Sequence, residues 1–71
     1  MRHEELEPFL NKKVRVFLSV IDEIDGNKNP VRFVASVTNV SPDGITFETY
    51  KKGEKILVKP EVIDMVMELK D

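Results

Sequence analysis

The fold is decided by residues 31–50, which read VRFVASVTNVSPDGITFETY. Two runs rich in β-branched and aromatic residues flank a cluster of turn-forming residues at 41–44. Pro42 suits the second position of a type I turn, and Gly44 is able to take the positive φ that closes it. This pattern predicts a β-hairpin, because apolar residues alternate along both runs and one face continues across the turn. The residues of that face are Val31, Phe33, Ala35, Val37, Ile45, Phe47 and Thr49.

Before this hairpin, the sequence predicts a short helix and a first strand. The helix lies within residues 4–11 and is expected to start near Glu7, because Pro8 is comfortable only in a first turn. The strand spans residues 14–21. Residues 22–30 then predict a long mobile loop, although Asp25 and Gly26 also suit a tight hairpin. Pro30 lacks an N–H group, so it is expected at the beginning of the following strand.

After the hairpin, two further strands are expected at 55–59 and 63–69, separated by a single 3₁₀ turn that begins at Pro60. A helix competes for the last segment, but strand is favoured because apolar residues recur at every second position. Those residues are Ile63, Met65, Met67 and Leu69. Five short strands joined by turns predict a small antiparallel barrel or a strongly bent sheet, and closure is favoured because it removes most of the exposed sheet edges. With a short helix in front and a proline-led turn before the last strand, the arrangement resembles an all-β, five-stranded SH3-like small barrel.

Length and composition limit the function. The chain has 71 residues, no cysteine, 34% charged residues and a formal net charge of −2. We expect one domain over residues 1–71, with 1–11 as an N-terminal helix or arm and 12–71 as the barrel. So small a core favours help from a partner subunit. The charge argues against general coating of nucleic acid, so any such role needs a local basic patch.

Several other classes find no support in the sequence. No apolar run approaches the length of a membrane span, so we expect a cytoplasmic protein without a membrane partner. The single histidine, His3, is near one end, so no serine has a plausible base within the fold. The acidic residues Asp22, Glu23 and Asp25 lack the ligand spacing of a calcium loop. We therefore predict no enzyme, no cofactor and no metal.

Several stretches resemble the Sm-like (Lsm) superfamily. They are residues 10–16 (LNKKVRV), 33–37 (FVASV), 56–58 (ILV), 60–63 (PEVI) and 65–66 (MV). The chain is also similar to the C-terminal barrel of the ribosome maturation factor RimP, in residues 24–28, 32–37 and 56–63. The Sm-like resemblance implies an RNA-binding barrel that forms homo-oligomeric rings by pairing the fourth strand of one copy with the fifth strand of the next. Two family features are altered, because residues 41–44 lack the usual Asn and Lys59 is followed by Pro60 rather than Gly.

The candidate RNA contacts are cations for phosphate and one aromatic ring for stacking. They are Lys12, Lys13, Arg15, Lys51, Lys52, Lys59 and Tyr50. Lys28, Arg32 and Phe17 are further cations and an aromatic residue near them. The alternative is that lysines only protect strand edges from aggregation.

The outward-looking hydrophobic residues indicate an interface. Phe17, Ile21, Val34, Val40, Leu57 and Val66 are expected opposite the core face, unless bent strands bury both faces. The predicted oligomer interface comprises Leu57, Val58, Met65, Val66 and Met67. The function predicted first is a non-enzymatic RNA-binding or RNA-associated module. The alternative is a protein-interaction adaptor, or a ribosome-assembly-associated barrel, that does not bind RNA directly.

Overall fold

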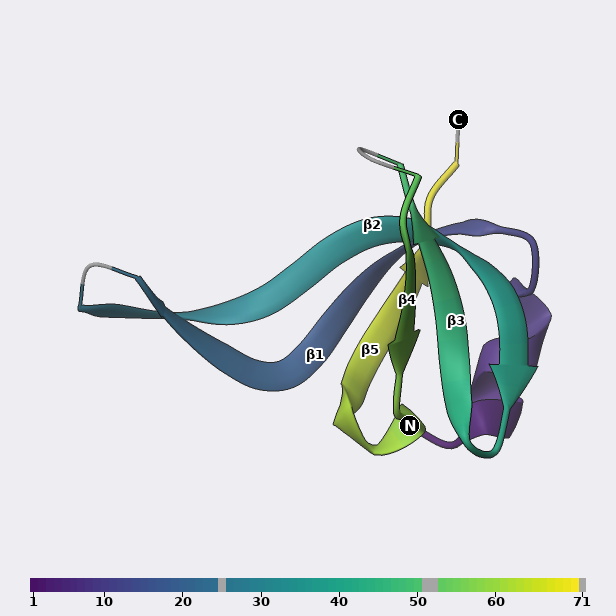
Figure 1. Cartoon of the computed structure of the whole chain (residues 1–71), viewed down its shortest axis with the longest axis horizontal. Coiled ribbons are helices and arrows are strands. Elements are labelled where there is room, and N and C mark those ends of the chain that lie inside the picture. The colour runs from purple at the N-terminus through teal and green to yellow at the C-terminus, as the bar shows by residue number, and fades with distance from the viewer. Residues whose placement is uncertain (25, 51–52, 71) are drawn as a thin grey trace.

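The chain folds into one curled, five-stranded antiparallel sheet preceded by a short 3₁₀ helix (Figure 1). The computed structural model describes residues 1–24, 26–50 and 53–70, and the side chains of 22–24, 29 and 30 are outside this description. The strand order is β4-β3-β2-β1-β5. The predicted all-β small barrel with a short N-terminal helix is confirmed. The elements are η1 (His3–Phe9), β1 (Lys13–Ile24), β2 (Asn27–Ser41), β3 (Gly44–Thr49), β4 (Lys55–Val58), η2 (Pro60–Val62) and β5 (Ile63–Glu68).

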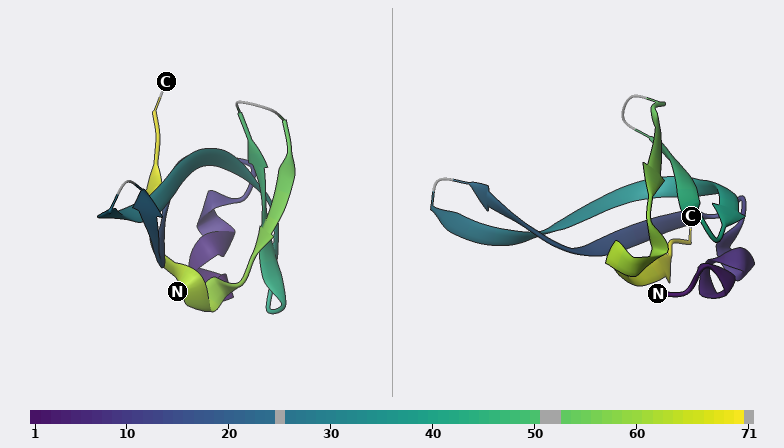
Figure 2. Two further views of the ribbon diagram at one scale, coloured as in Figure 1. Left: turned by 60° about the vertical axis from the view of Figure 1, so that its left-hand side comes forward. Right: turned by 60° about the horizontal axis from the view of Figure 1, so that its bottom comes forward.

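The short connection between the two edge strands makes the sheet curl. Five flat strands spaced by ~4.8 Å would hold β4 and β5 about 19 Å apart. The connection is only Lys59 followed by η2, and a 3₁₀ helix rises just ~2 Å per residue. This helix confirms the predicted turn beginning at Pro60. Because the connection is so short, it brings β4 and β5 close to each other. Figure 2 shows the strands wrapped around one side of η1.

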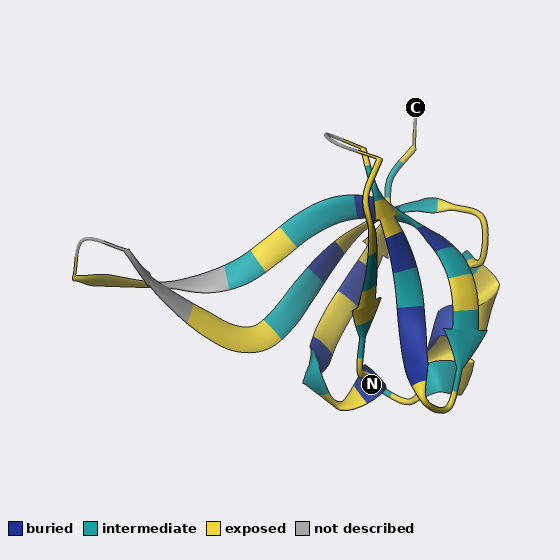
Figure 3. Cartoon of the chain, viewed as in Figure 1, coloured by how far each residue is buried: buried dark blue, intermediate teal, exposed yellow. Residues whose placement is uncertain are grey.

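The core is made by the concave face of the sheet and by one residue of η1. Leu6 enters this core with no exposed surface. The rings of Phe33 and Phe47 meet edge to face, with centroids 5.4 Å apart. Figure 3 shows that the buried positions gather in the barrel. Full burial of each such side chain stabilises the fold by ~1.5–3 kcal/mol. The buried residues are Leu6, Val14, Val16, Ala35, Val37, Ile45, Phe47, Ile63 and Val66.

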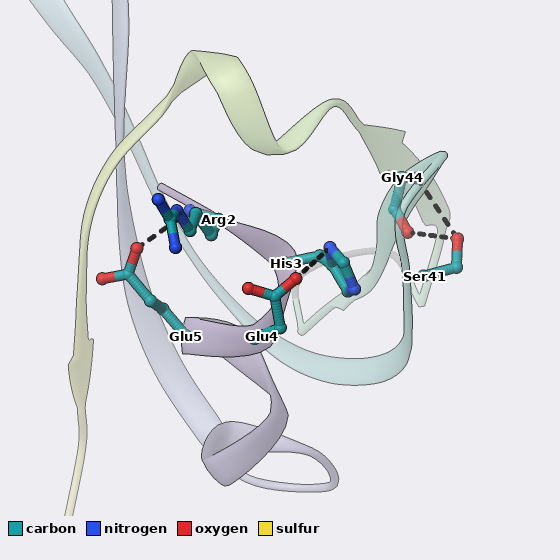
Figure 4. A network of polar contacts seen from close by, with 6 residues as sticks. All are labelled: Arg2, His3, Glu4, Glu5, Ser41 and Gly44. Carbon is teal, nitrogen blue, oxygen red and sulfur yellow. Dashed lines mark hydrogen bonds and ion pairs between the residues drawn. The ribbon is translucent and has the colours of Figure 1, made fainter.

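The helix begins earlier than predicted, at His3 rather than near Glu7. Its start is fixed by Arg2, whose N–H donates to Glu5 Oε1 at 3.0 Å (Figure 4). The Arg2 carbonyl oxygen also accepts from the Glu5 N–H at 3.1 Å. Pro8 consequently lies in the last turn, not in the first. The expectation failed because this capping arrangement outweighs the preference of proline for the helix start.

The predicted long loop at 22–30 is wrong, and a projecting hairpin takes its place (Figure 1). Pairing of β1 with β2 is interrupted between Phe17 and Ile21, then continues until Ile24 pairs with Asn27. We call residues 21–30 the arm. Gly26 has a φ of 79°, which suits a two-residue hairpin connection, while Asp25 is outside the described residues. Pro30 lies inside β2 rather than at its start, in a part where only two strands pair.

The hairpin of β2 and β3 is confirmed, with Ser41 paired to Gly44 across the turn. The Ser41 hydroxyl donates to the Gly44 carbonyl at 3.0 Å and accepts from the Gly44 N–H at 3.2 Å (Figure 4). Gly44 is not among the positive-φ residues, contrary to expectation. Glycine is favoured at position 44 by the lack of space for a side chain, because an added Cβ would lie 2.6 Å from Leu57 Cδ1.

Two bulges change which residues face the core. In β5, Leu18 pairs with Ile63 and Phe17 with Met65, so one residue of β5 is left over. Strand is confirmed for this segment, but its inward residues are Ile63 and Val66 instead of Ile63, Met65 and Met67. A second register shift, between Val37 and Asn39, turns Val40 inward against the core. The predicted outward positions of Val40 and Val66 are therefore wrong.

Candidate nucleic-acid interface

The convex side of the sheet carries a mixed basic and aromatic surface, which we call the outer face. Val14 and Val16 are buried, so the alternating residues Lys13, Arg15 and Phe17 point outward. Residues that pair across adjacent strands lie on the same face of a sheet, so the partners of these three residues also point outward. The outer face comprises Lys13, Arg15 and Phe17 of β1, Arg32, Val34 and Ser36 of β2, Met65 and Met67 of β5, Glu48 of β3 and Lys55 of β4.

Tyr50 lies against one end of this face and is fixed there by two contacts. The Lys13 Nζ atom is 4.6 Å from the centroid of the tyrosine ring, within the range of a cation–π interaction. The Tyr50 hydroxyl and the Ser36 Oγ atom share a hydrogen bond of 2.6 Å. The side chain still exposes 54% of its surface. The ring is therefore both held in place and accessible to a ligand.

A cavity of about 290 Å³ lies on the outer face, next along the strands from the residues that hold Tyr50. It is lined by Arg15, Arg32, Phe33 and Val34. Both arginines are exposed, and Phe17 pairs with Arg32 while Arg15 pairs with Val34. The two arginines that line this cavity thus come from adjacent strands. Its volume is just below the range of small-ligand pockets, which measure ~300–1,000 Å³.

The outer face is positive although the chain as a whole is negative. It carries the cations Lys13, Arg15, Arg32 and Lys55 against the single carboxylate of Glu48. The ion pairs formed by the described residues are elsewhere: Lys12 with Glu68 and His3 with Glu4, each at 3.2 Å. The chain has a net charge of −2, but the outer face is locally positive and attracts anions.

The structure gathers some of the predicted RNA contacts and separates others. Lys13, Arg15 and Tyr50 meet on the outer face. Lys12 precedes β1 and is paired with Glu68, and Lys59 follows the last residue of β4, at the end away from Lys55. The remaining two, Lys51 and Lys52, fall outside the described residues.

Arg32 was noted in the sequence only as a further cation near the predicted RNA contacts, and Ser36 was not identified. Their place beside Arg15 and Lys13 depends on the pairing of β1 with β2. The sequence predicted a long loop at 22–30 instead of a hairpin, so the pairing of β1 with β2 was not predicted. Besides the charge of Arg32, the sequence contained the signal that Arg32, Val34 and Ser36 alternate with the predicted inward face of the central hairpin.

The residues of the predicted oligomer interface are partly exposed and partly buried in the core. Leu57, Met65 and Met67 expose 71%, 45% and 48% of their surfaces. Val58 is half-buried against the core, and Val66 is a core residue with 9% exposure. The strands that carry these residues, β4 and β5, form the two edges of the described sheet.

No family model, curated protein or solved structure matches this chain. Within the described residues, no helix is long and apolar enough to cross a membrane. The same residues contain no group of three histidine or acidic side chains placed to hold a metal ion.

Proposed function

We propose that this protein is a non-enzymatic RNA-binding or RNA-associated module that acts as a homo-oligomer. The observation that carries the proposal is the meeting of Lys13, Arg15, Arg32 and Tyr50 on one exposed sheet face. Single-stranded nucleic acid is bound by surfaces that combine cations for the backbone with aromatic rings for the bases. The resemblance of the sequence to Sm-like proteins favours the same function.

The two edge strands support the oligomeric part of the proposal. An unpaired edge presents free N–H and C=O groups, and a 71-residue chain buries only a small core. Pairing β4 of one copy with β5 of the next, as in an Sm-like ring, would satisfy both edges. It would also cover Leu57 on β4. Light scattering tests this: a closed pentamer to heptamer supports the ring, and a monomer at all concentrations contradicts it.

RNA binding is tested by fluorescence anisotropy with a labelled, unstructured RNA at ~50 and ~200 mM salt. The variant combines Lys13→Gln, Arg15→Gln and Arg32→Gln, and the control is Lys59→Gln, a cation at the far end of β4. Each phosphate contact on a single strand contributes ~0.7 to the slope of log K against log salt. Three contacts therefore give the natural protein a loss of roughly 20-fold between the two salt concentrations, which the triple variant should lack.

No RNA affinity at the lower salt concentration would refute this function. If Lys59→Gln, which removes one charge, lowers log K by a third as much as the triple variant, which removes three, only net charge matters. The cytoplasmic location predicted from the sequence belongs to the same proposal.

A protein-interaction adaptor is the second candidate. The exposed Leu57, Met65 and Met67 favour it, because methionine-rich apolar surface suits protein partners. This candidate predicts no RNA binding at ~50 mM salt and a complex with a purified protein partner that nuclease treatment leaves intact.

A further inference from the structure

Resting on the proposed function, we infer that the outer face takes single-stranded RNA along β1. One base stacks on Phe17 and another on Tyr50, and Arg15 with Arg32 holds the phosphate between them. The proposed ligand is therefore single-stranded rather than double-stranded RNA, and it runs along β1. Such binding requires the two rings to be accessible, correctly spaced and separated by unpartnered cations.

The spacing of the rings follows from the strand itself. Outward residues of a strand are ~6.7 Å apart, so Phe17 is ~13 Å along β1 from Lys13, the residue that lies over the Tyr50 ring. That separation is several times the ~3.4 Å rise of a stacked strand. The two rings therefore suit bases that are splayed apart from each other. Splayed bases occur in single-stranded RNA, whereas a duplex keeps its bases stacked inside.

Both rings are supported by neighbouring side chains and remain partly exposed. Phe17 is half-buried between its cross-strand neighbours Arg32 and Met65. Tyr50 is anchored through its hydroxyl, and Lys13 covers a ring face. A ring that is already positioned loses little conformational freedom when a base stacks on it.

The arginines stand where the connecting phosphate would pass. Arg15 is midway between Lys13 and Phe17 on β1, and it lines the 290 Å³ cavity together with Arg32. Neither guanidinium has a carboxylate partner within the described residues. Guanidinium groups match phosphate oxygens in a bidentate manner, so two arginines that line one cavity favour a phosphodiester over a larger anion.

The test is anisotropy of the full chain with a labelled single strand and with a duplex of the same sequence at ~50 mM salt. Phe17→Leu and Tyr50→Leu each remove one ring, and Tyr50→Phe is the control that keeps the ring and loses only the hydroxyl. Each leucine variant should weaken single-strand binding by roughly 5- to 150-fold, the range for loss of one base–aromatic stack. Tyr50→Phe should retain most of the affinity, and the duplex should bind more weakly than the single strand.

The possible failures are distinguishable. If both leucine variants, shown to be folded by circular dichroism, bind like the natural protein while the triple cation variant does not, the path is wrong and the proposed function stands. Equal binding of the duplex would likewise overturn the single-strand inference alone. If no RNA binds but a polyglutamate peptide does, the outer face belongs to an acidic protein partner, and both proposals fail.

Discussion

The bulge in β5 can be tested by a pair of substitutions that preserve side-chain shape. Val66→Thr replaces a methyl group with a hydroxyl, and Met65→Gln replaces a thioether with an amide of similar length. Val66 is 9% exposed and packs in the core, whereas Met65 is 45% exposed on the outer face. If side chains simply alternated along β5 without a bulge, Met65 would face the core and Val66 would be exposed. The pair therefore reports directly which residue faces inward.

The expected sizes of the two effects differ clearly. A hydroxyl buried in the core without a partner costs ~1–3 kcal/mol, whereas an exposed polar substitution changes stability by less than ~0.5 kcal/mol. A 71-residue domain has a total stability of ~4–11 kcal/mol, so Val66→Thr removes a substantial part of it. At ~4–8 °C per kcal/mol, a 2 kcal/mol loss lowers the Tm by about 8–16 °C.

Urea unfolding followed by circular dichroism, at one protein concentration for all variants, measures both changes. The midpoint should fall for Val66→Thr and stay near that of the natural protein for Met65→Gln. A bulge at this position is refuted if Met65→Gln is the more destabilising change, because Met65 rather than Val66 would then face the core.

Three further predictions concern the remaining contacts of the barrel. Glu5→Ala removes the carboxylate that caps η1 and should lower the free energy of unfolding by ~0.5–1 kcal/mol, measured by urea titration; no change would show that the cap is irrelevant. Phe47→Leu loses the edge-to-face contact with Phe33 and should cost ~1–3 kcal/mol in the same assay; a neutral result would contradict the core. Gly44→Ala forces the exposed Leu57 aside and should cost less than ~1 kcal/mol, with the loss recovered when Leu57→Ala is added; an unrecovered loss would indicate backbone strain instead.

The fold was predictable wherever alternation runs without interruption. Residues 32–37 and 45–47 contain no bulge, so Ala35, Val37, Ile45 and Phe47 are buried as the pattern indicates. The pattern failed in β5, where a bulge reverses the faces and leaves no local signature in the sequence. It also failed in the arm, because a hairpin and a loop use the same turn residues there.

The candidate site was predictable for residues that depend on one strand alone. Lys13 and Arg15 alternate with buried valines, so their exposure follows from β1 itself. The partnership of Arg15 with Arg32 could not be derived, since it requires the register between two strands. Tyr50 was identified as an aromatic candidate, but its bond to Ser36 also depends on tertiary structure.

The central claim is that the outer face is where RNA binds, and a titration followed by NMR tests it most directly. Adding an unstructured single-stranded RNA to the ¹⁵N-labelled chain should shift the resonances of Lys13, Arg15, Phe17, Arg32 and Tyr50, and leave those of η2 unchanged. Shifts confined to η2 and the end of β4, with the outer face unaffected, would contradict this claim.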